Sequence, residues 1–152
     1  RLMLTALAEH IGPGDRVVDL GTGSGILAIA SARLGADVLG IDLDPAAAPA
    51  VQANATANGV GERVDVRIGD ISDMSDDERF DVALLNVTID IHESVAPAVE
   101  RLDVPMLIVA GILDGEQAER TARLHGQSPT ERLSEDGWVA LVFDRERGDA
   151  AT

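Results

Sequence analysis

The chain has 152 residues, of which 45% are hydrophobic, and its 27 acidic and 12 basic side chains give a formal net charge of -15. This length suits one domain with a full hydrophobic core, and the longest apolar run, 105–113, is far shorter than the roughly 20 residues of a membrane helix. An acidic field of this size repels DNA and RNA phosphates and favours basic partners, although a salt-rich habitat or the genome composition explains the acidity equally well.

The chain contains no cysteine, so neither a disulfide framework nor a thiolate zinc site is available. It begins at Arg1 and runs directly into an apolar periodic segment, without a leader of the secretory kind. We therefore expect a cytoplasmic protein without a membrane segment, cut from a longer chain whose N-terminal region is missing here.

Hydrophobic periodicity predicts helices and strands in alternation along the first half of the chain. In chain order the spacing predicts a helix over 2–11, a strand over 16–20, a helix over 26–34, a strand over 37–43, a helix capped by Asp44 and opened by Pro45 that ends at 58–59, and strands over 64–68 and 81–86. The stretch 70–79 is too acidic for the core, and we expect a loop or a short surface helix there.

The second half continues the alternation and ends in a hairpin. A helix is predicted over 88–102, and Pro97 should kink or split it because proline lacks the backbone donor. The remaining pattern predicts a strand over 106–110, a helix over 114–125, and strands over 131–134 and 138–143 joined across 135–137. Together these elements predict an α/β domain over 1–145, with a mostly parallel seven-stranded sheet, helices on both faces, an antiparallel C-terminal hairpin, and a polar tail over 146–152.

The loop after the first predicted strand reads Asp19-Leu20-Gly21-Thr22-Gly23-Ser24-Gly25. Its three glycines let a ligand approach the backbone closely, and the helix that follows directs its positive end toward negative charge. An NAD fingerprint would place the third glycine at position 26, where this chain has Ile26, so the spacing points away from NAD. The alternative is a tight turn with a purely structural purpose.

Two carboxylates follow neighbouring predicted strands at the same edge of the sheet. Asp42 ends the second strand, where a carboxylate can accept hydrogen bonds from both hydroxyls of a ribose. Asp70 ends the third strand and can meet the edge of an adenine. The alternatives are an ordinary strand-end carboxylate for Asp42 and a turn aspartate for Asp70, whereas Asp44 fits helix capping better.

Three segments together resemble a known family in order and spacing: V-V-D-L-G-T-G-S-G-I-L-A-I-A at 17–30, G-I-D-L-D-P at 40–45 and A-N-A-T-A-N-G-V at 53–60. They are similar to the class I methyltransferases, which use S-adenosylmethionine and have a Rossmann-like fold. Within that class the chain most resembles the PrmA family, enzymes that methylate amino groups of a large-subunit ribosomal protein. That likeness rests on A-G-I-L at 110–113, E-Q at 116–117 and G-W-V-A-L at 137–141, and it covers nearly the whole chain.

The resemblance implies S-adenosylmethionine as the cofactor and S-adenosylhomocysteine as its product. The cofactor-binding residues that it implies are Asp19, Gly21, Thr22, Gly23, Gly25, Asp42, Asp70 and Asn86. Asp42 would hold the ribose hydroxyls and Asp70 the adenine. Asn86, at the end of the fourth strand, falls where the family has its A-N-I-L-A element beside the methyl acceptor. It is therefore also the predicted catalytic residue, able to orient an amine through its side-chain carbonyl.

The chain departs from the family on the acceptor side. It reads L-N-V-T-I at 85–89 in place of that element, lacks the Pro-Gly-Gly turn before the fifth strand, and contains no N-terminal substrate-recognition domain within these residues. The Asn-Pro-Pro-aromatic motif of amide and adenine methyltransferases is absent as well. These departures leave the predicted cofactor site intact and the acceptor open.

Three functions remain open: methyl transfer to amino groups of a protein of ribosomal type, methyl transfer to a small molecule or another protein residue, and cofactor binding by a non-catalytic interaction module. The predicted partner is a basic protein such as a ribosomal protein, and neither DNA nor a membrane is predicted. No metal site is predicted, because no His or carboxylate group shows ligand spacing. His92 could serve as a general base, but a surface or capping histidine is favoured, and packing is favoured over a substrate platform for Trp138.

Overall fold

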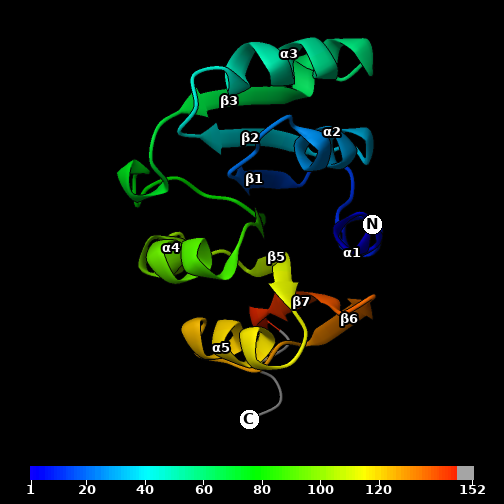
Figure 1. Cartoon of the computed structure of the whole chain (residues 1–152). Helices are drawn as coiled ribbons and strands as arrows, with labels where there is room; N and C mark the ends of the chain where they lie inside the picture. The colour runs from blue at the N-terminus through cyan, green and yellow to red at the C-terminus, as the bar shows by residue number, and fades with distance from the viewer. Residues whose placement is uncertain (147–152) are drawn as a thin grey trace.

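Seven strands form one sheet in the order β3-β2-β1-β4-β5-β7-β6, with helices on both faces, in the computed structural model, which describes residues 1–146 (Figure 1). The strands are β1 Arg16–Leu20, β2 Asp37–Asp42, β3 Val64–Ile68, β4 Val82–Asn86, β5 Met106–Leu113, β6 Glu131–Glu135 and β7 Trp138–Asp144. The helices are α1 Leu2–His10, α2 Ile26–Arg33, α3 Ala47–Ala57, α4 Ile89–Arg101 and α5 Glu116–Leu124, with short 3-10 turns η1 Gly61–Arg63 and η2 Ile71–Asp73. The predicted fold class is confirmed, and the predicted tail beyond residue 146 lies outside the described residues.

Helices α1, α2 and α3 cover one face of the sheet, and α4 and α5 cover the other (Figure 1). The strands between them are apolar on both sides, as parallel strands buried on two faces must be. Alternate residues of β1 therefore enter different cores: Val17 packs with α1 and α2, and Val18 packs with α4. The continuous apolar runs of the sequence follow directly from this double burial.

The order of the strands places β1 and β4 side by side at the centre of the sheet. From β1 the chain proceeds outward through β2 and β3, and it then returns to add β4 and β5 on the other side. Loops that leave such neighbouring strands diverge, and ligands of open α/β sheets bind in the crevice that opens at their carboxyl ends. Leu20 of β1 pairs with Leu85 of β4, so the glycine loop and Asn86 emerge beside each other at this point.

Helices α3 and α4 each differ from the prediction in a way that a local contact explains. Helix α3 begins at Ala47 rather than at Pro45, because the Asp44 carboxylate accepts the Ala46 N–H at 2.9 Å in a local turn before the helix starts. Helix α4 runs unbroken from Ile89 to Arg101 with Pro97 inside it, so of the two expectations for Pro97, a kink or a split, the split is wrong. Pro97 is exposed, and the carbonyl that it leaves without an intrahelical donor can therefore bond to water.

Strand β5 is longer than predicted because it continues through a bulge. Its pairing with β7 shifts register between Val109 and Ile112, and Gly111 in the bulge has a φ of +83°. The sequence pattern ends at Ala110 because a glycine in a strand is read as a break. The hairpin of β6 and β7 is antiparallel as predicted, and it turns at Asp136 and Gly137, whose φ angles of 51° and 81° suit a type I′ turn.

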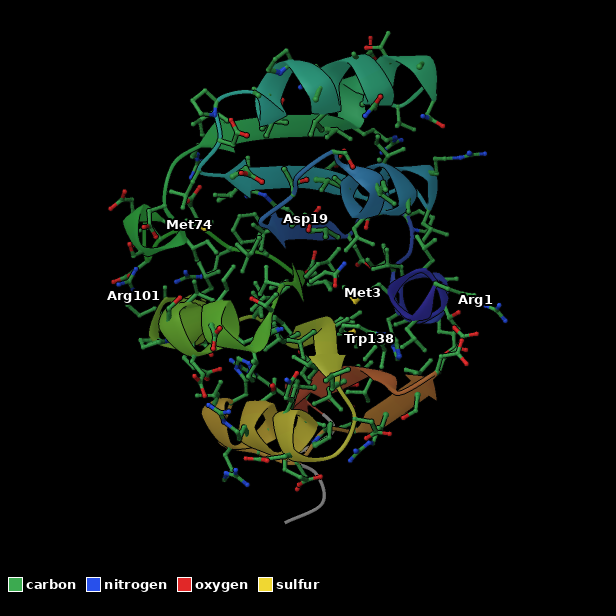
Figure 2. The ribbon with its side chains drawn as sticks, viewed as in Figure 1. Arg1, Met3, Asp19, Met74, Arg101 and Trp138 are labelled. Atoms are coloured by element: carbon green, nitrogen blue, oxygen red, sulfur yellow. The ribbon has the colours of Figure 1, made fainter. Side chains whose placement is uncertain are left out.

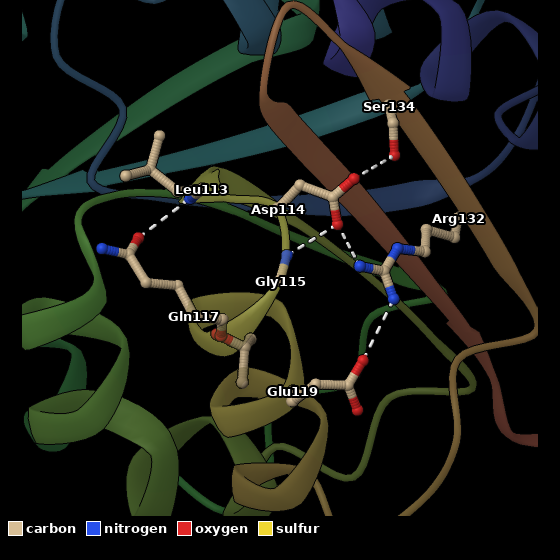
Figure 3. A network of polar contacts seen from close by, with 8 residues as sticks. Leu113, Asp114, Gly115, Gln117, Glu119, Arg132 and Ser134 are labelled. Atoms are coloured by element: carbon tan, nitrogen blue, oxygen red, sulfur yellow. Dashed lines mark hydrogen bonds and ion pairs between the residues drawn. The ribbon is translucent and has the colours of Figure 1, made fainter.

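A polar network fastens this hairpin to the end of β5 (Figure 3). Asp114 accepts hydrogen bonds from Arg132 and from the Ser134 hydroxyl of β6, and Arg132 also bonds Glu119 of α5 at 3.1 Å. The Asp114 N–H donates to the carbonyl of Gly137 at 2.9 Å. The position of the hairpin turn relative to β5 is thereby set by side chains from three elements.

Within residues 1–146, no helix combines the length and the hydropathy needed to cross a membrane.

Candidate active site

The glycine loop lies at the carboxyl end of β1, in a backbone conformation that glycine alone adopts easily. Gly21, Gly23 and Gly25 have φ angles of 77°, 56° and 87°. A Cβ at Gly25 would stand 2.8 Å from Cγ1 of Val51, so the absence of a side chain lets α3 approach the start of α2. At Gly23 a Cβ would meet no heavy atom within 4 Å, and the loop is open to a ligand on that side.

Asp19 lies beneath the loop rather than on its surface. Its side chain is 2% exposed, and its Oδ2 accepts the hydroxyl of Thr22 at 2.8 Å. Burial raises the pKa of Asp19 to about 6, although hydrogen bonds from Thr22 and from the Ala28 N–H act in the opposite direction. Thr22 is itself buried and packs over Gly40 of β2, where a Cβ would come within 2.9 Å. The pair holds the loop from below.

Asp42 joins the end of β2 to the glycine loop. Its Oδ2 accepts the Gly23 N–H at 2.8 Å, and its Oδ1 accepts the Asp44 N–H at 3.0 Å. A carboxylate offers about four acceptor positions, so two remain for a diol. Asp44 is thereby part of the support of Asp42, a role that the sequence did not indicate.

A cavity of about 520 Å³ opens beside Asp42, between the ends of β1, β2 and β3 and the start of α4. Its lining includes Gly21, Ile41, Asp42, Gly69, Asp70, Ser72, Val87 and Ile91. The N–H and the hydroxyl of Ser72 donate to Oδ1 of Asp70 at 2.9 and 2.8 Å, and they hold the pKa of that carboxyl below its ordinary value. The volume is within the usual range for small-molecule sites.

Asn86 lies at a second cavity, of about 450 Å³, on the other side of the β1–β4 junction. The residues that line it come from four parts of the chain: Arg1, Leu2, Met3 and Leu4; Ile26 and Leu27; Asn86, Ala110 and Gly111; and Glu135, Asp136, Trp138 and Val139. Figure 2 shows Met3 and Trp138 in the region between α1 and the hairpin, with Asp19 beyond them in β1. This second cavity combines exposed apolar side chains with two carboxylates at the hairpin.

The backbone of Val87 and Gly111 separates the two cavities. Val87 lines the first and Gly111 the second, and a Cβ at Gly111 would lie 2.4 Å from the Val87 carbonyl oxygen. The Val87 N–H bonds the carbonyl of Ala110 at 3.3 Å, as the last link of β4 to β5. We call residues 86–87 and 110–111 the divide.

The structure corrects two of the sequence interpretations. His92 is not at the surface: its side chain is fully buried, and Nε2 lies 2.8 Å from the carbonyl oxygen of Ala110. Trp138 is not core packing: it is 50% exposed and lines the cavity of Asn86. Neither placement could be read from periodicity, because each depends on the packing of segments far apart in the sequence.

Another group of potential metal ligands lies away from both cavities. Glu9 and His10 at the end of α1 and Glu131 at the start of β6 bring their ligand atoms within 4.8 Å of one another. His10 Nε2 contacts a carboxylate oxygen of Glu131 at 3.0 Å. More than a hundred residues separate these groups in sequence, so ligand spacing could not reveal them. The contact links α1 to β6.

The predicted site residues thus come together at one edge of the sheet. Asp42 and Asp70 share the first cavity with Gly21, and Asn86, in the divide, faces the second cavity. Asp19 and Thr22 support the loop from within, and Gly25 packs against α3. The carboxylates and the tryptophan of the hairpin, and residues 1–4, were not among the predicted site residues.

Comparison with known proteins gives one consistent picture. The sequence model of the family described as ribosomal protein L11 methyltransferase (PrmA) matches residues 1–146. A ribosomal protein L11 methyltransferase of Thermus thermophilus is 40% identical over 95% of this chain and 58% of its own length. One of Desulfitobacterium hafniense is 37% identical over 92% of this chain and 46% of its own length. The chain therefore spans about half the length of the curated relatives that it matches.

Solved structures support the same relationship. A ribosomal protein L11 methylase from Lactobacillus delbrueckii subsp. bulgaricus superposes with a TM-score of 0.83 at 25% identity, over 93% of this chain and 75% of that one. A SAM-dependent methyltransferase from Geobacter sulfurreducens, in complex with S-adenosyl-L-homocysteine, is 31% identical with a TM-score of 0.61, over 71% of this chain and 47% of that one.

Proposed function

The chain belongs to the ribosomal protein L11 methyltransferase (PrmA) family, and from this premise we propose that it binds S-adenosylmethionine at the glycine loop and transfers the methyl group to an amino group of a basic protein. The observation that carries the proposal is the pair of cavities that meet at the divide. The first cavity has carboxylates that can hydrogen-bond a nucleoside, and the second has the exposed Asn86 amide and the hairpin carboxylates, which can bind an amine.

The residues around the first cavity fit the cofactor. Two acceptor positions of Asp42 remain for the ribose hydroxyls. The other carboxylate oxygen of Asp70 can accept a hydrogen bond from the exocyclic amino group of an adenine. Apolar side chains of Ile41, Val87 and Ile91 provide flat contact for a ring. The open face of Gly23 and the buried carboxylate of Asp19 lie on the side where an amino acid moiety with a positive charge would follow.

The bound cofactor would supply a methyl group already activated by its sulfonium, so the protein has to position a nucleophile in line with that carbon more than it has to supply a strong acid or base. An amine attacks only in its neutral form, because the ammonium has no lone pair, so the acceptor has to release a proton to solvent before it reacts. In our proposal the side-chain carbonyl of Asn86 accepts a hydrogen bond from the amine and so directs the nitrogen lone pair toward the cofactor.

The acceptor cavity fits a cationic side chain on a protein. Glu135 is paired with Arg1 at 3.3 Å, and the exposed Asp136 beside it attracts a positive charge to the rim. The half-exposed ring of Trp138 can lie against the charge or against the aliphatic stem behind it. The net charge of -15 also attracts a positively charged protein over longer distances. The names of the relatives identify ribosomal protein L11 as their substrate, and we propose a protein of this kind for the present chain.

Calorimetric titration tests the cofactor assignment. We expect S-adenosylmethionine and S-adenosylhomocysteine to bind and NAD not to bind. If neither sulfur compound binds under any salt condition in which the chain is folded, the cofactor assignment is wrong and the glycine loop serves another purpose.

Transfer of a labelled methyl group to purified bacterial ribosomal protein L11 tests the acceptor. Asn86→Ala should lower kcat by about 100-fold with little change in cofactor affinity, because one oriented contact to the nucleophile is lost. Labelling of small amines with none of L11 would favour a small-molecule methyltransferase. Cofactor binding without transfer to any acceptor would favour a non-catalytic interaction module.

A further inference from the structure

His92 is a buried side chain that contacts the divide and that the proposed mechanism does not use. It lies in the first turn of α4, and its side chain has no exposure to solvent. A carbonyl oxygen can only accept, so the 2.8 Å contact with Ala110 requires that Nε2 carry the proton and donate it. The imidazole N–H is thus used in a hydrogen bond to the backbone of β5.

The bond closes a short loop of chain around the divide. From Asn86 the chain passes through Val87 into α4, and the ring of His92 then returns to the carbonyl of Ala110, which pairs with Asn86 across the two strands. The Val87 N–H also donates to this carbonyl, at a long 3.3 Å. His92 therefore makes a shorter bond to the Ala110 carbonyl than the backbone donor does.

Gly111, which follows Ala110 in β5, packs against the Val87 peptide with no room for a side chain. Gly111 lies so close to the Val87 peptide that a Cβ would be 2.4 Å from the carbonyl oxygen, and the register of β5 shifts just beyond Val109. Regular ladder bonds cannot fix a backbone at a bulge. Ala110 and Gly111 are the residues between the paired Val109 and Ile112, so a side chain that bonds the Ala110 carbonyl holds the bulge itself in place.

We infer that His92 is a positioning residue, which holds the divide in the geometry that methyl transfer from one cavity to the other requires. This inference rests on the proposed function. Transfer requires reacting atoms about 3–3.5 Å apart and in line, and a displacement of about 1 Å can cost a factor of about 100. Asn86 is attached to the backbone that His92 secures, so a shift of the divide moves the amide that would orient the amine.

The electrostatics of the pocket agree with a neutral donor. Burial lowers the pKa of His92, and His125, just after the end of α5, lowers it further, whereas the carbonyls of Ala110 and Val87 act in the opposite direction. The His125 ring is itself held by Glu100, through Nδ1 at 2.9 Å, and Arg145 bonds the same carboxylate at 2.7 Å. Near neutral pH the ring of His92 therefore donates without bringing a buried charge to the divide.

Two substitutions separate positioning from filling of space. His92→Leu occupies the volume and removes the donor, whereas His92→Gln keeps an N–H that can reach the same carbonyl. With ribosomal protein L11 as acceptor, we expect His92→Leu to lower kcat at least about tenfold and to change the KM for S-adenosylmethionine by less than about threefold. His92→Gln should recover most of the lost kcat.

Val99→Ala is the matched control. Val99 is fully buried in the same helix, about two turns beyond His92, and belongs to the core cluster that includes Leu102 and Phe143. Its apolar side chain cannot hydrogen-bond the backbone of the divide, so its truncation should destabilise the chain and leave kcat nearly unchanged. If His92→Leu behaves like Val99→Ala, or if His92→Gln fails to recover any activity that His92→Leu loses, the positioning role is wrong.

Nuclear magnetic resonance gives a readout without turnover. The ¹⁵N shifts of His92 should report a neutral ring protonated at Nε2 at pH 7, and His92→Leu should shift the amide signals of Val87 and Gly111 more than Val99→Ala does. A ring protonated at Nδ1 overturns the inference whatever the activity. A wild-type chain that binds no S-adenosylmethionine refutes the proposed function instead, and it does so before any variant is made.

Discussion

The glycine-loop side and the acceptor side of the site differ in how their polar groups are held. On the loop side Asp42 already accepts the Gly23 and Asp44 amides, and Asp19 accepts the Thr22 hydroxyl. On the acceptor side Asn86, Asp136 and Trp138 are exposed, and the cavity is assembled from segments that are distant in sequence. The polar groups of the first half are held by bonds within the chain, whereas Asn86, Asp136 and Trp138 of the second half are open to solvent.

This difference explains why the two sides have different sequence signatures. A preorganised loop needs particular residues at fixed local spacing, because glycines and carboxylates must meet within one strand-loop-helix unit. An acceptor surface needs only that suitable side chains reach the same place, and the four contributing segments can vary independently.

The largest effect should follow a change at the divide. Gly111→Ala places a Cβ 2.4 Å from the Val87 carbonyl oxygen at a φ of +83°, which combines backbone strain with a collision against backbone. We expect a loss of about 4 kcal/mol in the free energy of unfolding, measured by urea denaturation. Gly23→Ala, with positive φ but open space, is the control and should lose only about 1 kcal/mol. Equal losses would mean that the contact across the divide is not tight.

Asp19 gives the next largest effect, as a dependence on pH. Its folded-state pKa of about 6 is above the ordinary 3.8, so the folded chain binds this proton more tightly than the unfolded chain. Its contribution to stability is therefore present at low pH and is lost as pH rises from about 4 to about 6, by roughly 3 kcal/mol. The unfolding free energies of the wild type and Asp19→Asn should diverge across this window and run parallel above it. Parallel curves throughout would contradict a raised pKa.

Asp42→Ala tests the preorganised side directly. Loss of two charge-assisted hydrogen bonds to the ribose, each contributing about 1.5 kcal/mol, should weaken S-adenosylhomocysteine binding by about 100-fold in a calorimetric titration. Asp37→Ala removes a carboxylate from the opposite end of the same strand, where Asp37 pairs with Arg63 at 3.4 Å, and should leave the affinity unchanged. A comparable loss in both variants would indicate an effect of net charge instead of a ribose contact.

The smallest effect is expected at the network that holds the hairpin. Arg132→Ala removes the bonds to Asp114 and Glu119, but both carboxylates are well exposed. We expect a slight fall in Tm at low ionic strength that shrinks further at about 1 M salt, because exposed ion pairs contribute little and are screened. A loss that persists in high salt would show that the arginine packs as well as pairs.

The sequence predicted the strands of the parallel sheet closely, because their apolar runs are bounded by glycines and charges at both ends. It was less accurate where a tertiary contact replaces a local preference. Pro97 remains inside α4 because it faces solvent, and β5 passes through Gly111 because β7 pairs beyond the bulge. The helix after Asp44 starts later than predicted because the carboxylate bonds the Ala46 amide outside the helix.

By itself the sequence determined the fold class, the glycine loop and the two carboxylates of the first cavity, because all of these depend on periodicity and on spacing within single units. Only the tertiary structure decided that residues 1–4, Asn86 and the hairpin around Trp138 share a second cavity, and that His92 is buried against β5. Contacts of this kind join elements separated by tens of residues. They cannot be predicted from local sequence preferences, because those preferences do not determine which elements pack together.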